Sequence, residues 1–500
     1  MSRCATSSRS DGRRRPGGPQ SGSSLIAAIM LTAIMALTVV VSLSVAQSSD
    51  SSSGREGREG VAVQAADAGV NQYISRLVED PRYYDHFVDP AEDPRIDPGG
   101  VAHAPGSPWV AGTPWTYGPA PETWTEVQDA RFGKARYSLR ISPPGLGDDV
   151  VTVQSTAEVA LDGTPGVRRS IQSQIYPTSI ADFQMISDRS IVYGTSATTT
   201  GKLYSADDIR HSGTARAPAY AQHFVCAGSG GSVCTGSNPS PSVYQGGAYD
   251  VTTTPSFRDK FPTPIDFGHF TQSRLDLKDA AAATGVYRND PSVEGWMIQF
   301  RADATIRIWR VLATDGDLGR RITRLSCPET VGVPTNGAMY FEQSVVVGDG
   351  STLSDDCGGV GPRASVVNGR VTVATSSDQN LYVGGDIAYA AEGDDVLGLI
   401  SGREVVIAEY VPLDLTWRAA SLAQNGRWRT NRGSPRSPNP HRRMHYIGAQ
   451  ATRQGGYASM FQQREYEYDE TLQRLRPPFY PVLEGAWSTR YWREVAAPGA

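Results

Sequence analysis

The chain has 500 residues, of which 39% are hydrophobic and 20% are charged, and its formal net charge is −5. This length is enough for two or three domains with sizeable cores, and the mixed, slightly acidic charge argues against a nucleic-acid-binding protein. The 52 glycines and 33 prolines argue against a mainly helical protein, and the 22 tyrosines favour strands.

The N-terminal segment combines a basic leader, residues 1–22, with an uncharged stretch from Leu25 to Ala46. At about 1.5 Å per residue, this stretch is long enough to cross a hydrocarbon core of roughly 30 Å. We predict a transmembrane helix over residues 23–46, with the basic N-terminus in the cytoplasm and the remaining chain exported. The alternative is a cleaved secretory signal peptide, whose apolar region is usually shorter, about 7–15 residues.

A second helical segment is expected after a polar spacer. Apolar residues recur at steps of three and four from Val61 to Val78, which is typical of one helix face. The spacer, residues 48–60, contains three glycines, each of which costs a helix about 1 kcal/mol relative to alanine. We therefore expect a frayed or hinged helix at this spacer, or a plain flexible linker.

The next segment predicts a small antiparallel sheet. Residues 81–121 are rich in proline and glycine, which excludes a regular helix there. Alternating apolar and polar residues at 137–141, 151–153 and 167–175, separated by turn signals, predict three strands. We expect residues 47–178 to form one domain in which the helix packs on this sheet.

From residue 179 to residue 500 the pattern changes to short apolar strands separated by Gly, Asn and Asp turns. The clearest run comprises Arg370–Ala374, Leu381–Val383, Asp386–Tyr389, Leu397–Ile400, Val405–Ile407 and Leu415–Trp417. This spacing suits a β-sandwich, a barrel or a parallel β-helix, and the alternation of short strands with tight turns favours the β-helix. The predicted fold class is mainly β: an N-terminal transmembrane α-helix, a helix with a small antiparallel sheet, then a parallel β-helix (solenoid)-like domain.

The cysteines predict disulfides rather than a metal site. Cys4 lies in the leader, which leaves four exported cysteines, an even number in an oxidising compartment: Cys226, Cys234, Cys327 and Cys357. Three pairings are open, and Cys226–Cys234 with Cys327–Cys357 joins nearest neighbours. No Cys-x-x-Cys or histidine spacing supports a metal site, and no cofactor is predicted.

No catalytic residues are predicted, and we expect that the protein is not an enzyme. Neighbouring residues on a strand point to opposite faces, so adjacent aspartates are poor acid–base partners. We interpret the three aspartate pairs as turn residues: Asp207/Asp208, Asp355/Asp356 and Asp394/Asp395. His441 and His445 lack a third ligand for a metal. Several aromatic residues near the C-terminus are interpreted as core or capping residues rather than as a binding surface: Tyr466, Tyr468, Tyr480, Tyr491 and Trp492.

The sequence Gly22-Ser23-Ser24-Leu25-Ile26-Ala27 resembles a type IV prepilin junction. The resemblance implies cleavage after Gly22 by a prepilin peptidase, with Ser23 as the first mature residue, and an assembly helix beginning with Leu25, Ile26 and Ala27. Ala27 stands where major pilins carry glutamate. The resemblance is therefore to minor pilins, which commonly lack that glutamate.

Two further segments are similar to PilX-like minor pilins. The run Gln64-Ala65-Ala66-Asp67-Ala68-Gly69-Val70 is similar to the one that follows the membrane span in that family, and it implies that Ala66, Gly69 and Val70 belong to the assembly helix. Residues from about 180, most clearly after 365, resemble the uncharacterised β-rich domain that is often attached to PilX-like N-termini. The resemblance brings no catalytic residues.

We therefore expect a non-enzymatic, minor-pilin-like structural or assembly subunit of a type IV pilus or related pseudopilus. It would sit in the cytoplasmic membrane with its C-terminal domain outside, or in a pilus at the cell surface. Expected partners are other pilin or pseudopilin subunits, the pilus assembly machinery, prepilin peptidase, membrane lipid and, as a candidate ligand, a surface glycan, but no nucleic acid. The alternative is a membrane-tethered β-helical adhesin or carbohydrate-active enzyme.

Overall fold

The computed structural model describes residues 56–79, 83, 115–116, 124–127, 134–142, 144, 150–161, 164–194, 197–222, 225–226, 265–348, 354–359, 364–431, 441–458 and 460–497. Within these residues the protein is mainly β, with extensive parallel sheets. No helix among them is both long and apolar enough to cross a membrane. The predicted leader and the predicted span at 23–46 lie outside the described residues.

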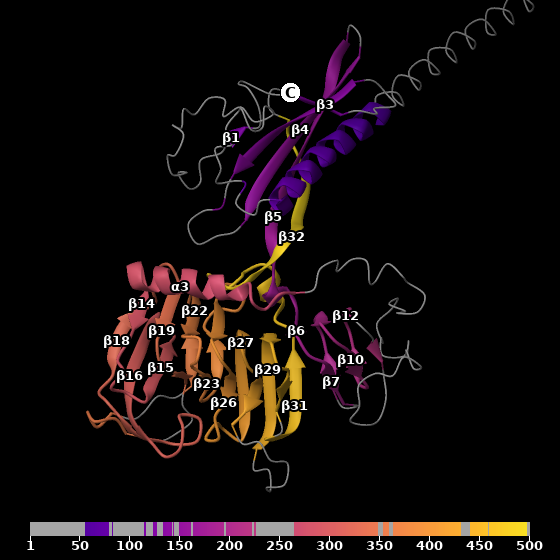
Figure 1. The fold of residues 1–500 in the computed structure, drawn as a ribbon. Helices are drawn as coiled ribbons and strands as arrows, with labels where there is room; N and C mark the ends of the chain where they lie inside the picture. Colours follow the sequence, from indigo (N-terminus) through magenta and orange to yellow (C-terminus); the bar gives the residue numbers. More distant parts are fainter. Residues whose placement is uncertain are drawn as a thin grey trace, which may run out of the picture.

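The first part of the structure, here called the head, is a helix on an antiparallel sheet (Figure 1). The helix covers residues 56–79. The strands follow the order β1-β3-β4-β5-β32, with β2 beside β3. Their bounds are β1 (Trp115–Thr116), β2 (Thr125–Val127), β3 (Lys134–Ser142), β4 (Val151–Leu161), β5 (Thr164–Ser179) and β32 (Val482–Val495).

Alternation along the strands explains how the helix and the sheet pack. Tyr137, Leu139 and Ile141 on β3 are buried, as the period of two predicts. They pack with Val70 and Leu77 of the helix in one core cluster. The predicted helix face and the predicted head strands are thus present.

The expected fraying of the helix is not seen at residues 56–60. The helix already includes Gly57 and Gly60, and Arg169 of β5 forms an ion pair with Glu59. This contact and the burial of Ala62 against the sheet both hold the first turns of the helix, despite the poor helix propensity of the two glycines. Residues 48–55 of the spacer lie outside the described residues.

The last strand departs from the expectation that residues 179–500 form one β-helical unit. β32 returns to the head and pairs antiparallel with β5 from Val482↔Ser179 to Val495↔Ser170. Residues 180–481 are therefore inserted between two neighbouring strands of the head sheet. Figure 1 shows β5 and β32 running together as the connection between the head and the second part. Long-range pairing of this kind leaves no local sequence pattern.

The inserted part is a solenoid of short parallel strands. Its first coils comprise β6 (Met185–Ser187), β7 (Ile191–Tyr193), β8 (Thr198–Thr199), β9 (Leu203–Ser205), β10 (Ile209–His211), β11 (Thr214–Ala215), β12 (Ala219–Ala221) and β13 (Val225–Cys226). Strands three places apart along the chain are stacked in parallel, as β6-β9-β12, β7-β10-β13 and β8-β11. Each coil thus contributes one strand to each of three faces.

A second set of coils follows helix α3 (Phe270–Thr284), which lies against β19. Its strands are β14 (Val286–Arg288), β15 (Gly295–Arg301), β16 (Thr305–Thr314), β17 (Ile322–Leu325), β18 (Glu329–Gly332), β19 (Ala338–Phe341), β20 (Val345–Val347), β21 (Ser365–Val367), β22 (Arg370–Thr375), β23 (Leu381–Val383), β24 (Ile387–Tyr389), β25 (Val396–Ser401), β26 (Val405–Ile407), β27 (Asp414–Ala423), β28 (Trp428–Thr430), β29 (His441–Thr452), β30 (Gly456–Tyr457) and β31 (Phe461–Glu467). Antiparallel pairing of β16 with β15, β17 and β18 closes the far end of this stack.

The stacking order differs from the order along the chain. The first face runs β14-β19-β22-β25-β27-β29 and then continues into β6, β9 and β12, all in parallel. The last coil in sequence, β29 to β31, therefore lies beside the first coil, β6 to β8. We call this junction the seam. Figure 1 shows β6 next to β29 and β31, with β7, β10 and β12 beyond them.

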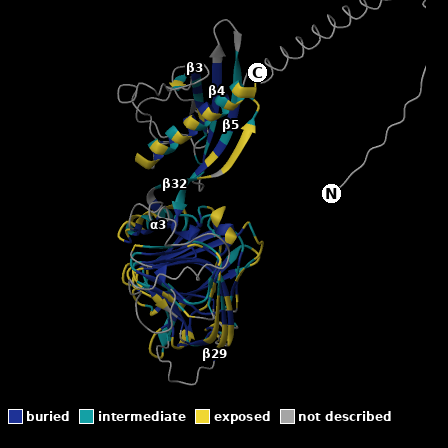
Figure 2. Ribbon diagram, turned by 90° about the vertical axis from the view of Figure 1, so that its right-hand side faces the viewer, coloured by how far each residue is buried: buried dark blue, intermediate teal, exposed yellow. Residues whose placement is uncertain are grey.

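The solenoid is filled by rows of apolar side chains that repeat from coil to coil. Val345, Leu381 and Val405 are paired in register, and all three are fully buried. Figure 2 shows buried strands inside the solenoid and exposed residues around its periphery. Two short 3-10 helices, η1 (Ile180–Asp182) and η3 (Glu470–Gln473), lie where the chain enters and leaves the solenoid.

Candidate functional site

The two stacks of coils are joined unevenly at the seam. On the first face β29 pairs directly with β6, from Gln450↔Met185 to Thr452↔Ser187. On the second face, among the described strands, β30 pairs with β28 and β7 pairs with β10, but β30 and β7 do not pair with each other. A cavity of about 610 Å³ lies at this junction, and its lining comes from both stacks. We call it the seam cavity.

Gln450 interrupts an otherwise mostly apolar row inside the solenoid. Successive register partners along this inner row are Met339, Val373, Leu399, Ser421, Gln450, Met185, Leu203 and Ala219. The Ser421 hydroxyl lies 3.1 Å from the Tyr446 hydroxyl. Gln450 is 5% exposed and lines the cavity, and its side-chain amide has no hydrogen-bond partner among the described residues.

Two tyrosines from opposite sides of the seam meet at the cavity. Tyr193 comes from β7 and Tyr466 from β31, and their rings lie edge to face with centroids 5.9 Å apart. The Tyr193 ring also lies 5.0 Å from the ring of buried His211. Both tyrosines are half-buried, and neither tyrosine hydroxyl has a hydrogen-bond partner within the described part of the chain. The cavity therefore presents two aromatic rings with unpartnered hydroxyl groups.

Tyr193 and Tyr466 of the cavity, and His211 beside Tyr193, are uncharged near neutral pH. Burial raises the pKa of Tyr466 to about 12, and burial together with the nearby Tyr466 raises the pKa of Tyr193. Burial lowers the pKa of His211 to about 4. Both tyrosines are thus neutral hydrogen-bond donors and acceptors, and the histidine is neutral.

Charge is confined to the rim of the cavity. Arg464 and Glu465 are the charged members of the described lining, and both are exposed. Glu465 forms an ion pair with Arg443 on β29. The rim has both signs of charge, so it does not select an anion or a cation.

The residues predicted from the prepilin resemblance fall in two groups. Gly22, Ser23, Leu25, Ile26 and Ala27 lie outside the described residues.

The other three predicted residues, Ala66, Gly69 and Val70, are on the helix of the head. Ala66 and Val70 are buried against the sheet. A Cβ atom on Gly69 would lie 2.6 Å from Cδ2 of Tyr137 and 2.7 Å from the Ser155 Oγ. Glycine thus permits the close approach of helix and sheet at this point.

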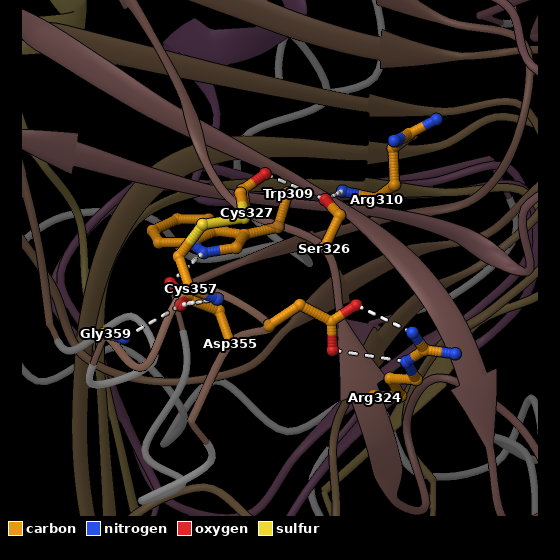
Figure 3. The surroundings of a disulfide bond; sticks show 9 residues. Trp309, Arg310, Arg324, Ser326, Cys327, Asp355, Cys357 and Gly359 are labelled. Atoms are coloured by element: carbon orange, nitrogen blue, oxygen red, sulfur yellow. Dashed lines mark hydrogen bonds and ion pairs between the residues drawn. A yellow bond between two sulfur atoms is a disulfide. The ribbon is translucent and has the colours of Figure 1, made fainter.

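The structure joins Cys327 and Cys357 in a disulfide with a Cα–Cα distance of 5.2 Å. Asp355, beside this bond, accepts hydrogen bonds from the Trp309 indole and from the backbone N–H groups of Cys357 and Gly359 (Figure 3). Cys226, on β13, is also disulfide-bonded, and Cys234 lies outside the described residues.

Two of the aspartates that were interpreted as turn residues, Asp395 and Asp207, accept hydrogen bonds from other parts of the chain. Asp395 accepts hydrogen bonds from Gly369 N and Ala391 N, and Asp207 accepts one from the Ser190 hydroxyl. The two histidines have separate partners: His445 Nε2 lies 3.0 Å from Glu467, and His441 Nε2 lies 3.2 Å from the Val411 carbonyl. Within the described residues no group of three side chains could hold a metal ion.

The aromatic residues near the C-terminus have three different environments. Tyr468 and Tyr480 are buried in the core, as expected, whereas Tyr491 and Trp492 on β32 are 39% and 48% exposed. Tyr466 is half-buried and packs against the main core of the solenoid, as expected, but it also lines the cavity. Tyr193 and Gln450 were not singled out, because only the three-dimensional stacking brings these strands together.

No protein-family model matches this chain, and no curated protein matches it. Among solved structures, it is similar to the crystal structure of the competence-associated pilin ComZ from Thermus thermophilus. The two chains are 14% identical, the match covers 87% of this chain and 97% of that chain, and the TM-score is 0.25. A TM-score this low supports no argument about the function of this chain.

Proposed function

We propose that the protein is a non-enzymatic, minor-pilin-like subunit of a type IV pilus or a related pseudopilus, which holds its solenoid outside the membrane. The observation that carries this proposal is the arrangement of the head. An N-terminal helix packs its Ala-rich face on a small antiparallel sheet, and the solenoid is inserted between β5 and β32. A basic leader and an apolar stretch precede this helix in the sequence.

The direction of the helix supports the same proposal. Figure 1 shows the indigo helix (residues 56–79) extending away from the solenoid, and its N-terminal part lies at the far end, where Glu59 pairs with Arg169. An apolar segment that continues from this end would enter a membrane or a filament core without meeting the solenoid. A domain this large is difficult to repeat along a thin fibre, so we propose a low-copy position at the tip or the side.

The contents of the seam cavity support a binding role rather than hydrolysis. Glycoside hydrolases commonly use two carboxylates about 5–10 Å apart. The described lining of the cavity includes one carboxylate, that of Glu465, and it is paired with Arg443. We therefore retain an adhesin as the second candidate function.

The test is the N-terminal residue of the protein purified from native membranes. The proposal predicts Ser23, and replacing Gly22 by leucine should leave a longer, membrane-bound precursor. Gly18→Leu, in the same leader, is the matched control and should be processed normally. A mature chain that begins after Ala46, or an intact Met1, would contradict the pilin proposal, and an intact anchor would favour the adhesin.

A further inference from the structure

The seam cavity has the properties of a preformed binding site. Gln450 is buried, with 5% of its surface exposed, and its amide lacks a partner among the described residues. Tyr193 and Tyr466 line the same cavity, and their hydroxyl groups also lack described partners. Buried polar groups are normally hydrogen-bonded, so the buried Gln450 amide, together with two half-buried tyrosine hydroxyls beside it, points to a ligand that supplies their partners.

The chemistry of these groups selects the class of ligand. A tyrosine hydroxyl and a glutamine amide each donate and accept hydrogen bonds, as the hydroxyl groups of a sugar do. The tyrosine rings add apolar surface for the C–H face of a sugar ring. Within the described lining a phosphate or carboxylate would meet no buried cation, and a nucleic-acid backbone needs more Lys or Arg than Arg464, the basic residue of that lining.

We propose that the seam cavity binds an uncharged sugar residue of a neutral glycan, through the hydroxyl groups of Tyr193 and Tyr466 and the amide of Gln450. The volume of about 610 Å³ lies within the usual range for small-molecule sites, roughly 300–1,000 Å³. The exposed side chains of Gln462 and Gln463 stand at the rim, where a continuing glycan chain would leave the cavity. This binding activity goes beyond the proposed pilus role and does not depend on it.

The experiment uses the full-length protein, purified in a detergent without a sugar headgroup. Maltohexaose, cellohexaose and mannohexaose are the neutral probes, hexagalacturonate is the anionic probe, and binding is measured by titration calorimetry. We expect at least one neutral probe to bind. If glucose or mannose displaces the bound hexasaccharide, a single sugar is sufficient for binding. If only the hexasaccharide binds, the site recognises a segment of a glycan chain.

Matched variants locate the binding site. Tyr193→Phe and Tyr466→Phe remove hydroxyl groups without described protein partners, so each should leave folding intact and weaken binding about threefold to tenfold. Tyr491→Phe, on exposed β32 of the head, should leave the affinity unchanged. Failure of every neutral probe to bind, binding of hexagalacturonate alone, or equal affinity of all three variants would overturn the proposal.

Gln450→Leu separates ligand binding from a structural role. Leucine would continue the apolar part of the inner row next to Met185, so the free protein should melt at a higher temperature while its glycan affinity falls. A lower melting temperature with unchanged glycan affinity would show that Gln450 serves the fold, and it would contradict the proposal. N-terminal sequencing tests the pilus role separately, so the two proposals can fail independently.

Discussion

Gln450 and Met185 are register partners on adjacent parallel strands, although Gln450 belongs to the last coil of the solenoid and Met185 to the first. The first and last coils therefore pair with each other through β6 and β29. Without this pairing, each of these strands would have an edge with unpaired backbone groups. Solenoids need protected ends for solubility, and here one internal end of each stack is covered by the other.

Gln184 should be a main stabilising residue of the seam. Its side-chain oxygen accepts hydrogen bonds from Thr200 N at 2.8 Å and Gly201 N at 2.7 Å, and its amide donates to the Tyr466 carbonyl at 3.0 Å. Gln184→Ala would leave one buried and two partly buried groups without their partner, at a cost of about 3 kcal/mol. Hydrogen exchange over residues 185–222 should become faster.

Gln299→Ala is the control for this change, because Gln299 makes an exposed hydrogen bond of 3.3 Å to the Ala364 carbonyl. It should leave exchange in the first coils unchanged. Equal exchange rates in the Gln184 variant and the wild type would show that the seam is held by other contacts.

Two glycines of the same helix should respond in opposite ways to alanine. At Gly69 the added methyl group would lie 2.6 Å from Tyr137, so the helix would have to move off the sheet, at a cost of about 1–3 kcal/mol. At Gly60 no atom lies within 4 Å, and alanine should stabilise the helix by up to about 1 kcal/mol. Chemical unfolding of the two variants checks this, and destabilisation of equal size at both positions would argue against close helix–sheet packing.

The disulfide between Cys327 and Cys357 should stabilise the solenoid by roughly 3 kcal/mol, because the two residues are 30 positions apart in the sequence. Reductant alone is not a clean test, since Cys226 is also disulfide-bonded. The double variant Cys327→Ser/Cys357→Ser should therefore be compared with the wild type under oxidising conditions. An unchanged melting temperature would show that this bond adds little to stability.

His211 should make the first coils sensitive to acid. Burial lowers its pKa from 6.5 to about 4, and its Nε2 lies 3.0 Å from the Thr199 hydroxyl. Between these two values the unfolded chain binds more protons than the folded protein, so the free energy of unfolding should fall as the pH falls from about 6.5 towards 4.

Melting temperatures between pH 7.5 and pH 5 would measure this effect above the range in which most carboxylates titrate. The variant His211→Gln removes the titrating group and should flatten the slope. A variant with the same slope as the wild type would assign the acid sensitivity to other groups.

Local patterns predicted the elements of this fold better than their assembly. The alternation of Tyr137, Leu139 and Ile141 and the helical spacing up to Val78 depend on the side-chain period, which can be read from neighbouring residues. The pairing of β32 with β5 and of β29 with β6 joins residues hundreds of positions apart, and no local period records it. Gln450 resembles any strand glutamine until its row partners are known, so the cavity could not be predicted from the sequence.

The insertion of the solenoid between β5 and β32 has a mechanical consequence. Ser179 and Val482, where the chain enters and leaves the solenoid, are register partners, and the Ser179 hydroxyl donates to the Pro481 carbonyl at 3.0 Å. Tension between the head and the solenoid is thus shared by two covalent strands that leave from one point. A load applied through the solenoid would stretch this pair rather than peel the coils off one by one.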